Sequence, residues 1–316
     1  MHRLRTFALA TIPSALLVAC GGGNVGGPPQ ATLNLGVVDG AVDGASSVVV
    51  QFTGVELQPS GGGNPISFAF TTPKQVDLLQ LQNNNSASLL TGASVPAGQY
   101  DWIRLDLSAG AGNAVAGSYI EISGQQYPII VPSGSQTGLK LVQGFTMTAN
   151  QLANFTIDFV LEQAITAPPG QQIGGVQAFL LRPALRLVDN VRSGEVSGTV
   201  ALSTLQALSP ACFDSNGNPT AKVYIFSGSG AMLTDIQIDP NTGLPPTGHV
   251  NPVVTPDVTV SSGAYSYAQP WLLAGPYTLA LECGADDPSS ADTLAFTPSA
   301  GVNAAVTANQ TMTVNF

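Results

Sequence analysis

Oxygen-bearing side chains recur on alternate residues at one place in this sequence. Asp214, Asn216 and Asn218 have the spacing with which a calcium-binding loop begins. The twelfth residue of such a loop would be Ile225, where a bidentate glutamate is required. We therefore expect a simple turn that binds no metal, with a calcium site as the alternative.

A second candidate site is an aromatic ring beside a guanidinium. Residues 102–107 alternate between large or charged and apolar side chains, which predicts a strand with one face in a core. Trp102 and Arg104 then share the outward face, where they could stack on a ligand. The alternatives are a Trp that only covers the sheet, and a hydrolytic site in which Asp101 or Asp106 acts beside Trp102.

The chain contains few histidines that could take part in catalysis. The two histidines are His2, at the extreme N-terminus, and His249, in a segment rich in Pro and Gly. A nucleophilic triad would have to use that single imidazole, and a zinc site needs three or four ligands. Asp286 and Asp287, like Asp39 and Asp43, are expected to be solvated turn carboxylates. We expect no catalytic residues, no cofactor and no enzyme activity.

The composition excludes nucleic acid as a partner. The 316 residues carry 9 basic and 19 acidic side chains, for a net charge of −10. Only 9% of the residues are charged, against about 25% in typical soluble domains. Binding to phosphate backbones requires clustered Lys and Arg, which this chain does not have. A hydrophobic fraction of 44% argues for folded domains over disorder.

The N-terminus reads as an export signal. Arg3 and Arg5 precede an uncharged apolar run from Phe7 to Ala19, which is too short to span a bilayer as a helix. The string Leu17-Val18-Ala19-Cys20 resembles the lipobox of bacterial lipoproteins, in which the chain is cut before the cysteine and the thiol is acylated, typically with palmitate. An ordinary secretory signal is the alternative.

This resemblance implies a signal peptide over residues 1–19, then a lipidated Cys20 and a Gly/Pro tether over residues 20–30. It implies a location in the bacterial cell envelope, with the lipid anchor making the membrane a partner. Residue 21 is Gly and not Asp, which by the sorting habit of such lipoproteins implies the outer membrane. Removal of Arg3 and Arg5 leaves 7 basic residues against 19 acidic ones, a net charge of −12.

Export to an oxidising compartment would also determine whether the remaining cysteines are oxidised to a disulfide. With Cys20 acylated, Cys212 and Cys283 form a pair with only one possible connectivity. In an oxidising compartment we expect them to form a disulfide, and the alternative is two separate buried thiols.

Period-two alternation dominates from residue 31 onward, and Gly/Pro turns separate the alternating stretches. The pattern predicts an all-β fold of two antiparallel β-sandwich domains, over residues 31–191 and 192–316. Phe155, Ile157, Phe159 and Leu161 should face a core, while Thr156, Asp158, Val160 and Glu162 face water. Asp239 to Asp257 reads as a long loop without structure of its own.

The last residues also alternate. Met312, Val314 and Phe316 are expected to occupy core positions of a paired terminal strand. A chain that ends on Phe after such alternation also leaves an outer-membrane β-barrel as an alternative.

Two families are similar to parts of this chain. Residues 31–191 resemble the DUF4382 family of exported bacterial lipoproteins, most visibly in the stretch from Val95 to Leu105 and in the stretch from Pro132 to Leu141. That family has no established catalytic residues. The C-terminal half resembles carboxypeptidase-regulatory-like or transthyretin-like modules at Asp214–Pro219, Ser262–Tyr265 and Ala274–Leu279, which implies an Ig-like or prealbumin-like β-sandwich.

These observations favour an envelope-anchored lipoprotein that acts as a non-enzymatic binding, adhesion or structural module. Its partner, a protein or a glycan, is not identified by the residues. The alternative is a carbohydrate-active or other hydrolytic accessory protein.

Overall fold

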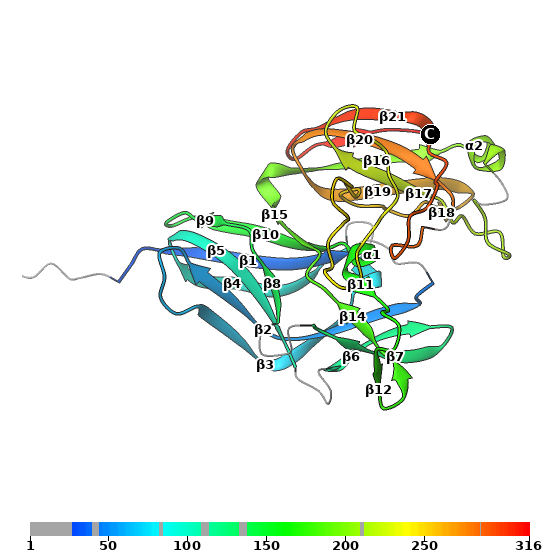
Figure 1. Ribbon diagram of the computed structural model, residues 1–316. Coiled ribbons are helices and arrows are strands. Elements are labelled where there is room, and N and C mark those ends of the chain that lie inside the picture. Colours follow the sequence, from blue (N-terminus) through cyan, green and yellow to red (C-terminus); the bar gives the residue numbers. More distant parts are fainter. Residues whose placement is uncertain are drawn as a thin grey trace, which may run out of the picture.

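The computed structural model is an all-β protein in which strands form two bodies, as the sequence predicted (Figure 1). It describes residues 27–39, 44–81, 85–108, 114–132, 138–208, 212–284 and 286–316. Cys20 and its flanking residues lie outside the described part of the chain. Within that part, no helix is both long enough and apolar enough to cross a membrane.

The N-terminal body is a sandwich of two sheets. One has the strand order β15-β10-β1-β4, and the other has the order β11-β14-β7-β6-β2-β5-β8, with β3 added to β2 and β9 added to β5. A small hairpin, β12-β13, stands apart. The strands are β1 (Gln30–Asp39), β2 (Ser47–Pro59), β3 (Ile66–Asp77), β4 (Ala87–Pro96), β5 (Gly98–Leu107), β6 (Ala114–Ile122), β7 (Gln125–Ile130), β8 (Leu139–Leu141), β9 (Phe145–Met147), β10 (Leu152–Phe159), β11 (Ile165–Thr166), β12 (Gln172–Ile173), β13 (Val176–Gln177), β14 (Phe179–Leu181) and β15 (Leu185–Asp189).

The core of this sandwich follows from the alternation. Leu33 and Leu35 of β1 face Phe52 and Leu57 of β2, and all four side chains are almost fully buried in one cluster. Pairing is mixed, because β1 runs parallel to β10 and β14 runs parallel to β7. Two short helices, η1 (Leu78–Leu81) and α1 (Leu161–Ala164), complete this body.

The C-terminal body is a second, smaller sandwich. Its sheets have the orders β18-β19-β16-β22 and β17-β20-β21, and β22 runs parallel to β16. A 3₁₀ turn, η3 (Asn190–Arg192), links the two bodies, and a short helix, α2 (Leu202–Ala207), follows the first strand. The strands are β16 (Ser193–Val200), β17 (Lys222–Ser227), β18 (Thr259–Ser261), β19 (Ala264–Leu273), β20 (Gly275–Glu282), β21 (Thr297–Val306) and β22 (Thr311–Thr313).

The predicted disulfide between Cys212 and Cys283 is present. It joins the residue that precedes the Asp214 turn to the end of β20, inside the core of the C-terminal sandwich. Both cysteines are buried, at 0% and 6% exposure. The bridge therefore closes a loop of 71 residues around this core.

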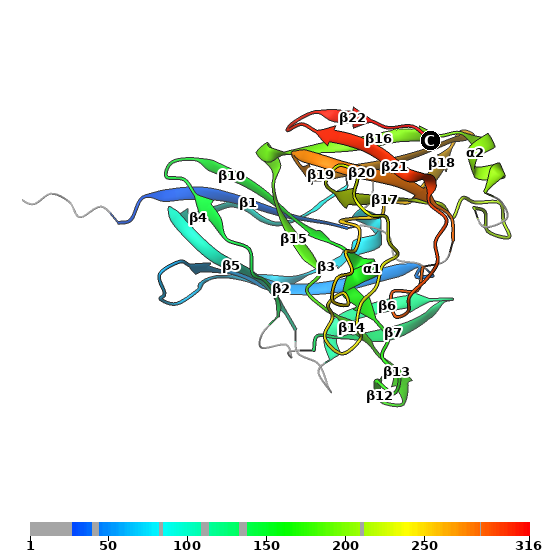
Figure 2. The ribbon, with the colours of Figure 1, turned by 45° about the horizontal axis from the view of Figure 1, so that its top comes forward.

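The outer side of β10 does not face water, contrary to the prediction. Thr156 and Asp158 are buried, and so are Val160 and Glu162 just beyond the strand. Asp158 forms an ion pair with Arg186 of the neighbouring strand. The physical reason is that the C-terminal body lies over this sheet, where β15 contacts β19 (Figures 1 and 2). Both faces of the sheet are thus covered near its β10–β15 end.

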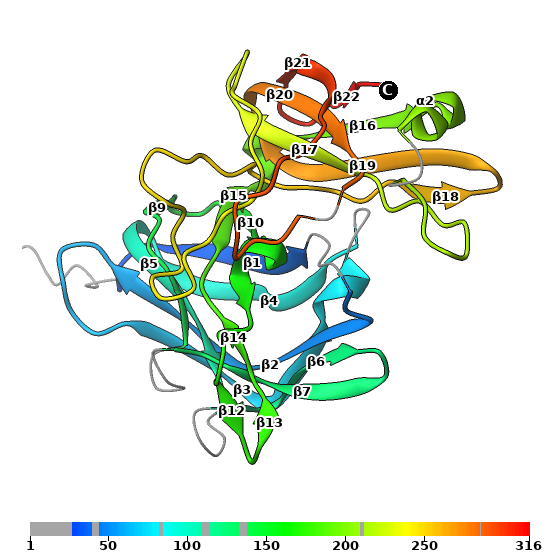
Figure 3. The ribbon, with the colours of Figure 1, turned by 45° about the vertical axis from the view of Figure 1, so that its right-hand side comes forward.

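Segments outside the strands hold the two bodies together. The stretch expected to be a loose loop descends from the C-terminal body along α1 and β14 (Figures 1 and 3). Arg182 donates to the carbonyl of Pro240, and the Gln163 amide donates to the carbonyl of Pro252 at 2.8 Å. The loop has no regular secondary structure, but its hydrogen bonds connect the two bodies.

A buried ion pair lies in the same interface. Glu162 of α1 pairs with Lys222 of β17, and it also accepts a hydrogen bond from the Thr255 hydroxyl. Each side chain of the pair is only 8% exposed, and Asp257 adds a second carboxylate 3.6 Å from the Lys222 Nζ. Burying these charges costs free energy, which the ion pair and its hydrogen bond offset.

The chain ends in a paired strand. The Val314 and Phe316 amides donate to carbonyls of β16, at 2.9 and 3.0 Å. Val314 is buried and Phe316 packs on the core, as predicted. Met312 is 36% exposed, so its predicted core position is wrong. All three residues of β22 are exposed, so both faces of this short strand are open at Met312 and the alternation does not decide burial there. The Tyr267 hydroxyl donates to the Val314 carbonyl, one residue beyond the strand.

Candidate functional site

The predicted pair Trp102 and Arg104 lies on the outer face of β5. The Arg104 guanidinium stands 5.4 Å from the centre of the Trp102 ring, and the Lys140 ammonium stands 4.5 Å from it. Lys140 belongs to β8, which pairs with β5 so that Arg104 and Lys140 are register partners. The structure thus brings two cations to one half-exposed ring, and sequence reasoning had named only one of them.

The carboxylates around this ring are engaged in the sheet. Arg104 forms ion pairs with Glu56 and with Asp106, the latter at 3.3 Å from Nε. Burial, followed by the nearby Glu56 charge, raises the pKa of Asp106. Asp101 is exposed and accepts a hydrogen bond from the Ser60 hydroxyl. Both carboxylates considered for hydrolysis therefore have partners within the sheet.

The Asp214 turn binds its own backbone. One oxygen of Asp214 accepts from the amides of Asn216 and Asn218, both at 2.8 Å, and the other accepts from the Asn218 side chain. These hydrogen bonds, led by that of the Asn218 side chain, lower the pKa of Asp214. Gly217 supplies the positive φ of 80° that closes the turn. The oxygens that a calcium ion would need are used locally.

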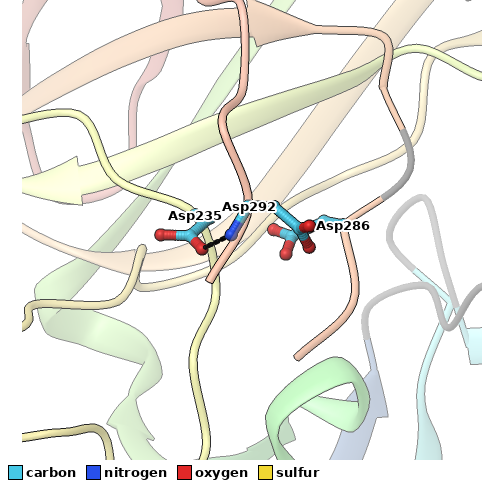
Figure 4. Close-up of side chains that lie close together, drawn as sticks. All are labelled: Asp235, Asp286 and Asp292. Carbon is cyan, nitrogen blue, oxygen red and sulfur yellow. Dashed lines mark hydrogen bonds between the residues drawn. The ribbon is translucent and has the colours of Figure 1, made fainter. Parts of the chain in front are cut away.

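A cluster of three aspartates was not predicted from the sequence. Asp235, Asp286 and Asp292 bring carboxylate oxygens within 4.8 Å of one another (Figure 4). They come from two irregular segments that cover the outer face of β17 and β20, where Tyr224 and Phe226 form a small apolar cluster with Ile236 and Ile238. The predictions that Asp286 and Asp39 are solvated are wrong, since Asp286 is half-buried in this cluster and Asp39 is only 7% exposed. Asp287 is exposed, and Asp43 lies outside the described residues.

Donors from the chain surround this cluster. The Asp292 amide donates to Asp235 at 2.6 Å, and the Gln237 side chain donates to both Asp235 oxygens. Asp286 accepts from the Tyr224 hydroxyl and from the Ile236 amide. The pKa of Asp286 is raised, because the effect of burial exceeds the opposite effect of the hydrogen bond from Tyr224.

His249 belongs to the same region. Its Nε2 lies 2.9 Å from the Asp235 carbonyl and 3.7 Å from an Asp235 carboxylate oxygen. Clustered carboxylates are the ligands that a hard cation such as Ca²⁺ prefers. Here the hydrogen bond from the Asp292 amide to Asp235 joins the two segments that carry these residues. The cluster therefore has a structural role in connecting them. No local spacing in the sequence marks it, because Asp235 and Asp292 are far apart along the chain.

A cleft lies between the two bodies. It has a volume of about 670 Å³ and is lined by β9, β15, η3 and the turn between β19 and β20. Phe145 and Phe155 form part of its wall, and Phe145 stacks on Tyr100 with ring centres 5.0 Å apart. Asp189 and Arg192 supply charges at its rim. Clefts of this size at domain junctions are a common setting for ligand binding.

The N-terminal body is similar to a known protein family. Residues 30–183 match the family model described as Domain of unknown function (DUF4382), so the N-terminal body carries a DUF4382 domain, as the sequence analysis expected. No curated protein matches this chain.

Among solved structures, this chain overlaps the Bacillus anthracis TIE protein with a TM-score of 0.18 and 11% identity, over 91% of this chain and 34% of that one. The chain thus spans about a third of the TIE protein. The minor pilin GBS52 of Streptococcus agalactiae overlaps with a TM-score of 0.19 and 11% identity, over 90% and 94% of the two chains. A putative adhesin from Bacteroides ovatus gives 0.20 and 8%, over 96% and 98%. Overlaps with TM-scores this low support no conclusion about function.

Proposed function

We propose that this protein is a lipoprotein of the bacterial cell envelope, held at the outer membrane by acyl chains on Cys20, and that it acts as a non-enzymatic binding or structural module. The observation that carries the proposal is the string Leu17-Val18-Ala19-Cys20 behind a basic and then apolar leader. The first strand begins at Gln30, so the Gly/Pro stretch between them serves as the tether.

The geometry of the folded part suits such an anchor. β1 starts at the end of the N-terminal body that lies away from the C-terminal body (Figures 1 and 2). Ten residues from Cys20 reach at most roughly 35 Å. An anchor at Cys20 would hold the DUF4382 domain next to the membrane and present the C-terminal sandwich outward.

The engaged carboxylates support the non-enzymatic part of the proposal. Asp101 accepts a hydrogen bond from Ser60, and Asp106 and Glu56 both form ion pairs with Arg104. The cleft between the bodies offers a place for a ligand. We further infer that the C-terminal sandwich is a carboxypeptidase-regulatory-like or transthyretin-like module, from its resemblance in sequence.

Membrane fractionation of Cys20→Ser tests the anchor. One acyl chain gives only marginal binding, whereas two or more anchor a protein stably. We expect the wild-type protein in the membrane fraction after a high-salt wash, and the Cys20→Ser variant in the soluble fraction or as the uncut precursor. The double variant Cys212→Ala/Cys283→Ala keeps Cys20 and is the matched control. A Cys20→Ser protein that is processed and stays on the membrane would contradict the proposal.

Turnover assays test the absence of enzyme activity. The purified protein, incubated with chromogenic glycosides, should release no chromophore above the rate without protein. Release that is lost in Asp106→Asn would favour the hydrolytic alternative.

A further inference from the structure

Arg192, the last residue of η3, is the only basic side chain of the described residues that has no partner in the protein. It is exposed, and its guanidinium makes no ion pair, hydrogen bond or ring contact within that part of the chain. The other basic side chains there form ion pairs, donate to backbone carbonyls or lie over aromatic rings, namely Lys74, Arg104, Lys140, Arg182, Arg186 and Lys222. In a chain with 19 acidic residues, this one guanidinium remains available to a group from outside the protein.

Arg192 lines the cleft between the two bodies, together with Asp189 at the end of β15. Asp189 is partly exposed, and one of its carboxylate oxygens accepts a hydrogen bond from the Val191 amide at 3.2 Å. Among the described residues, no ion pair joins Asp189 to Arg192. The cleft is therefore lined by one acidic and one basic residue, which solvent reaches and which do not neutralise each other.

Apolar and hydroxyl-bearing side chains line the same cleft. Val191, between the two charged residues along the chain, is 60% exposed, and Leu273 of the C-terminal body is 39% exposed. Thr146 of β9 and Thr148 just beyond it are exposed and supply hydroxyl groups. With a volume of about 670 Å³, the cleft is in the size range of pockets that hold small molecules. A ligand there could cover apolar surface and satisfy charges at once.

The two charges restrict the class of that ligand. A simple anion would pair with Arg192, but it would be repelled by Asp189 and by the net charge of −10. A simple cation would pair with Asp189 and leave Arg192 without a partner. Asp189 directly precedes η3 and Arg192 ends it, so both side chains start from one short turn. A small molecule that carries a carboxylate and an ammonium group satisfies both.

We propose that the cleft between the two bodies binds a zwitterionic α-amino acid with an apolar side chain. The Arg192 guanidinium donates to the ligand carboxylate, the geometry for which arginine is best suited, and the Asp189 carboxylate accepts from the ligand ammonium. The ligand side chain packs on Val191 and Leu273. The proposal rests on the binding role proposed above and names the class of its ligand, and it includes no bond-breaking step.

Blocked amino acids test each charge of the ligand separately. Calorimetric titration of the full-length protein, in a maltoside detergent, is carried out with L-leucine, with leucinamide, which has no carboxylate, and with N-acetylleucine, which has no ammonium. We expect L-leucine to bind saturably. Each blocked form should bind about tenfold more weakly, because one charged hydrogen-bonding contact is lost.

Variants of the two charged residues identify which residue contacts which group. Arg192→Gln should weaken the binding of L-leucine about tenfold and should no longer distinguish it from leucinamide. Asp189→Asn keeps an oxygen that can cap η3, and it should no longer distinguish L-leucine from N-acetylleucine. Lys140→Gln is the matched control, since it removes one exposed positive charge from a residue that does not line the cleft. It should bind all three ligands like the wild type.

The loss of discrimination separates contact from a general effect on the fold, because a distorted cleft would weaken all three ligands alike. A wild-type protein that does not bind L-leucine saturably would overturn the proposal. So would equal binding of L-leucine and its two blocked forms, or an Arg192→Gln variant that discriminates like the wild type. Membrane fractionation of the same variants keeps these outcomes distinct from the anchor at Cys20, since a protein that binds no amino acid can still be attached to the membrane.

Discussion

Reduction of the Cys212–Cys283 bridge is expected to destabilise the C-terminal sandwich selectively. The bridge closes a loop with a sequence separation of 71. The chain-entropy relation then gives about 4 kcal/mol lost on reduction at 25 °C. For a domain of this size that loss corresponds to a fall in melting temperature of roughly 15 °C. No cysteine lies between Cys20 and Cys212, so the DUF4382 domain contains no disulfide.

Calorimetry with and without a phosphine reductant measures this effect. We expect the transition of the C-terminal sandwich to move down while that of the N-terminal body moves less, through the loss of the interface alone. The Cys212→Ala/Cys283→Ala variant should melt like the reduced wild type and should not respond to reductant. An unchanged melting curve would refute the reasoning, and so would two titratable thiols in the unfolded, unreduced mature chain.

Three further perturbations follow from buried contacts. Glu162→Gln leaves the buried Lys222 charge with Asp257, 3.6 Å away, as its remaining acidic partner, so we expect a loss of about 1–3 kcal/mol in denaturant unfolding. The double variant with Lys222→Met should recover most of it, and a single variant as stable as the wild type would show that the ion pair does not stabilise the fold. Gly198→Ala would place a methyl group on the backbone of the C-terminal strand, whereas Gly275→Ala meets open space, so only the former should destabilise, by about 1–3 kcal/mol. Burial raises the pKa of Asp286, so its folded-state charge becomes unfavourable as the pH rises through that pKa. Asp286→Asn should therefore melt above the wild type at pH 7 and equal to it below about pH 4, and a lower melting point at pH 7 would contradict the assigned cause.

The alternation of apolar residues was enough to predict the strands and the inward side of each. β5 illustrates this, because Ile103 and Leu105 are buried while Trp102 and Arg104 face outward. Period-two patterning reports one covered face, however, and it cannot show that a second body covers the other. Asp158 was therefore assigned to water, whereas its charge is paired with Arg186 under the C-terminal sandwich.

The candidate sites were harder to predict because they are built across long sequence separations. Asp235 and Asp292 meet only when two irregular segments pack on the outside of β17 and β20. Likewise Phe145 and Leu273 line one cleft only because the two bodies pack against each other.

The most direct test of the account is the mass of the N-terminal peptide of the mature protein isolated from the envelope. We expect a peptide that begins at Cys20 and carries a diacylglyceryl group and an N-acyl chain, with residues 1–19 absent. A peptide that begins at another residue, or an unmodified Cys20, would contradict it.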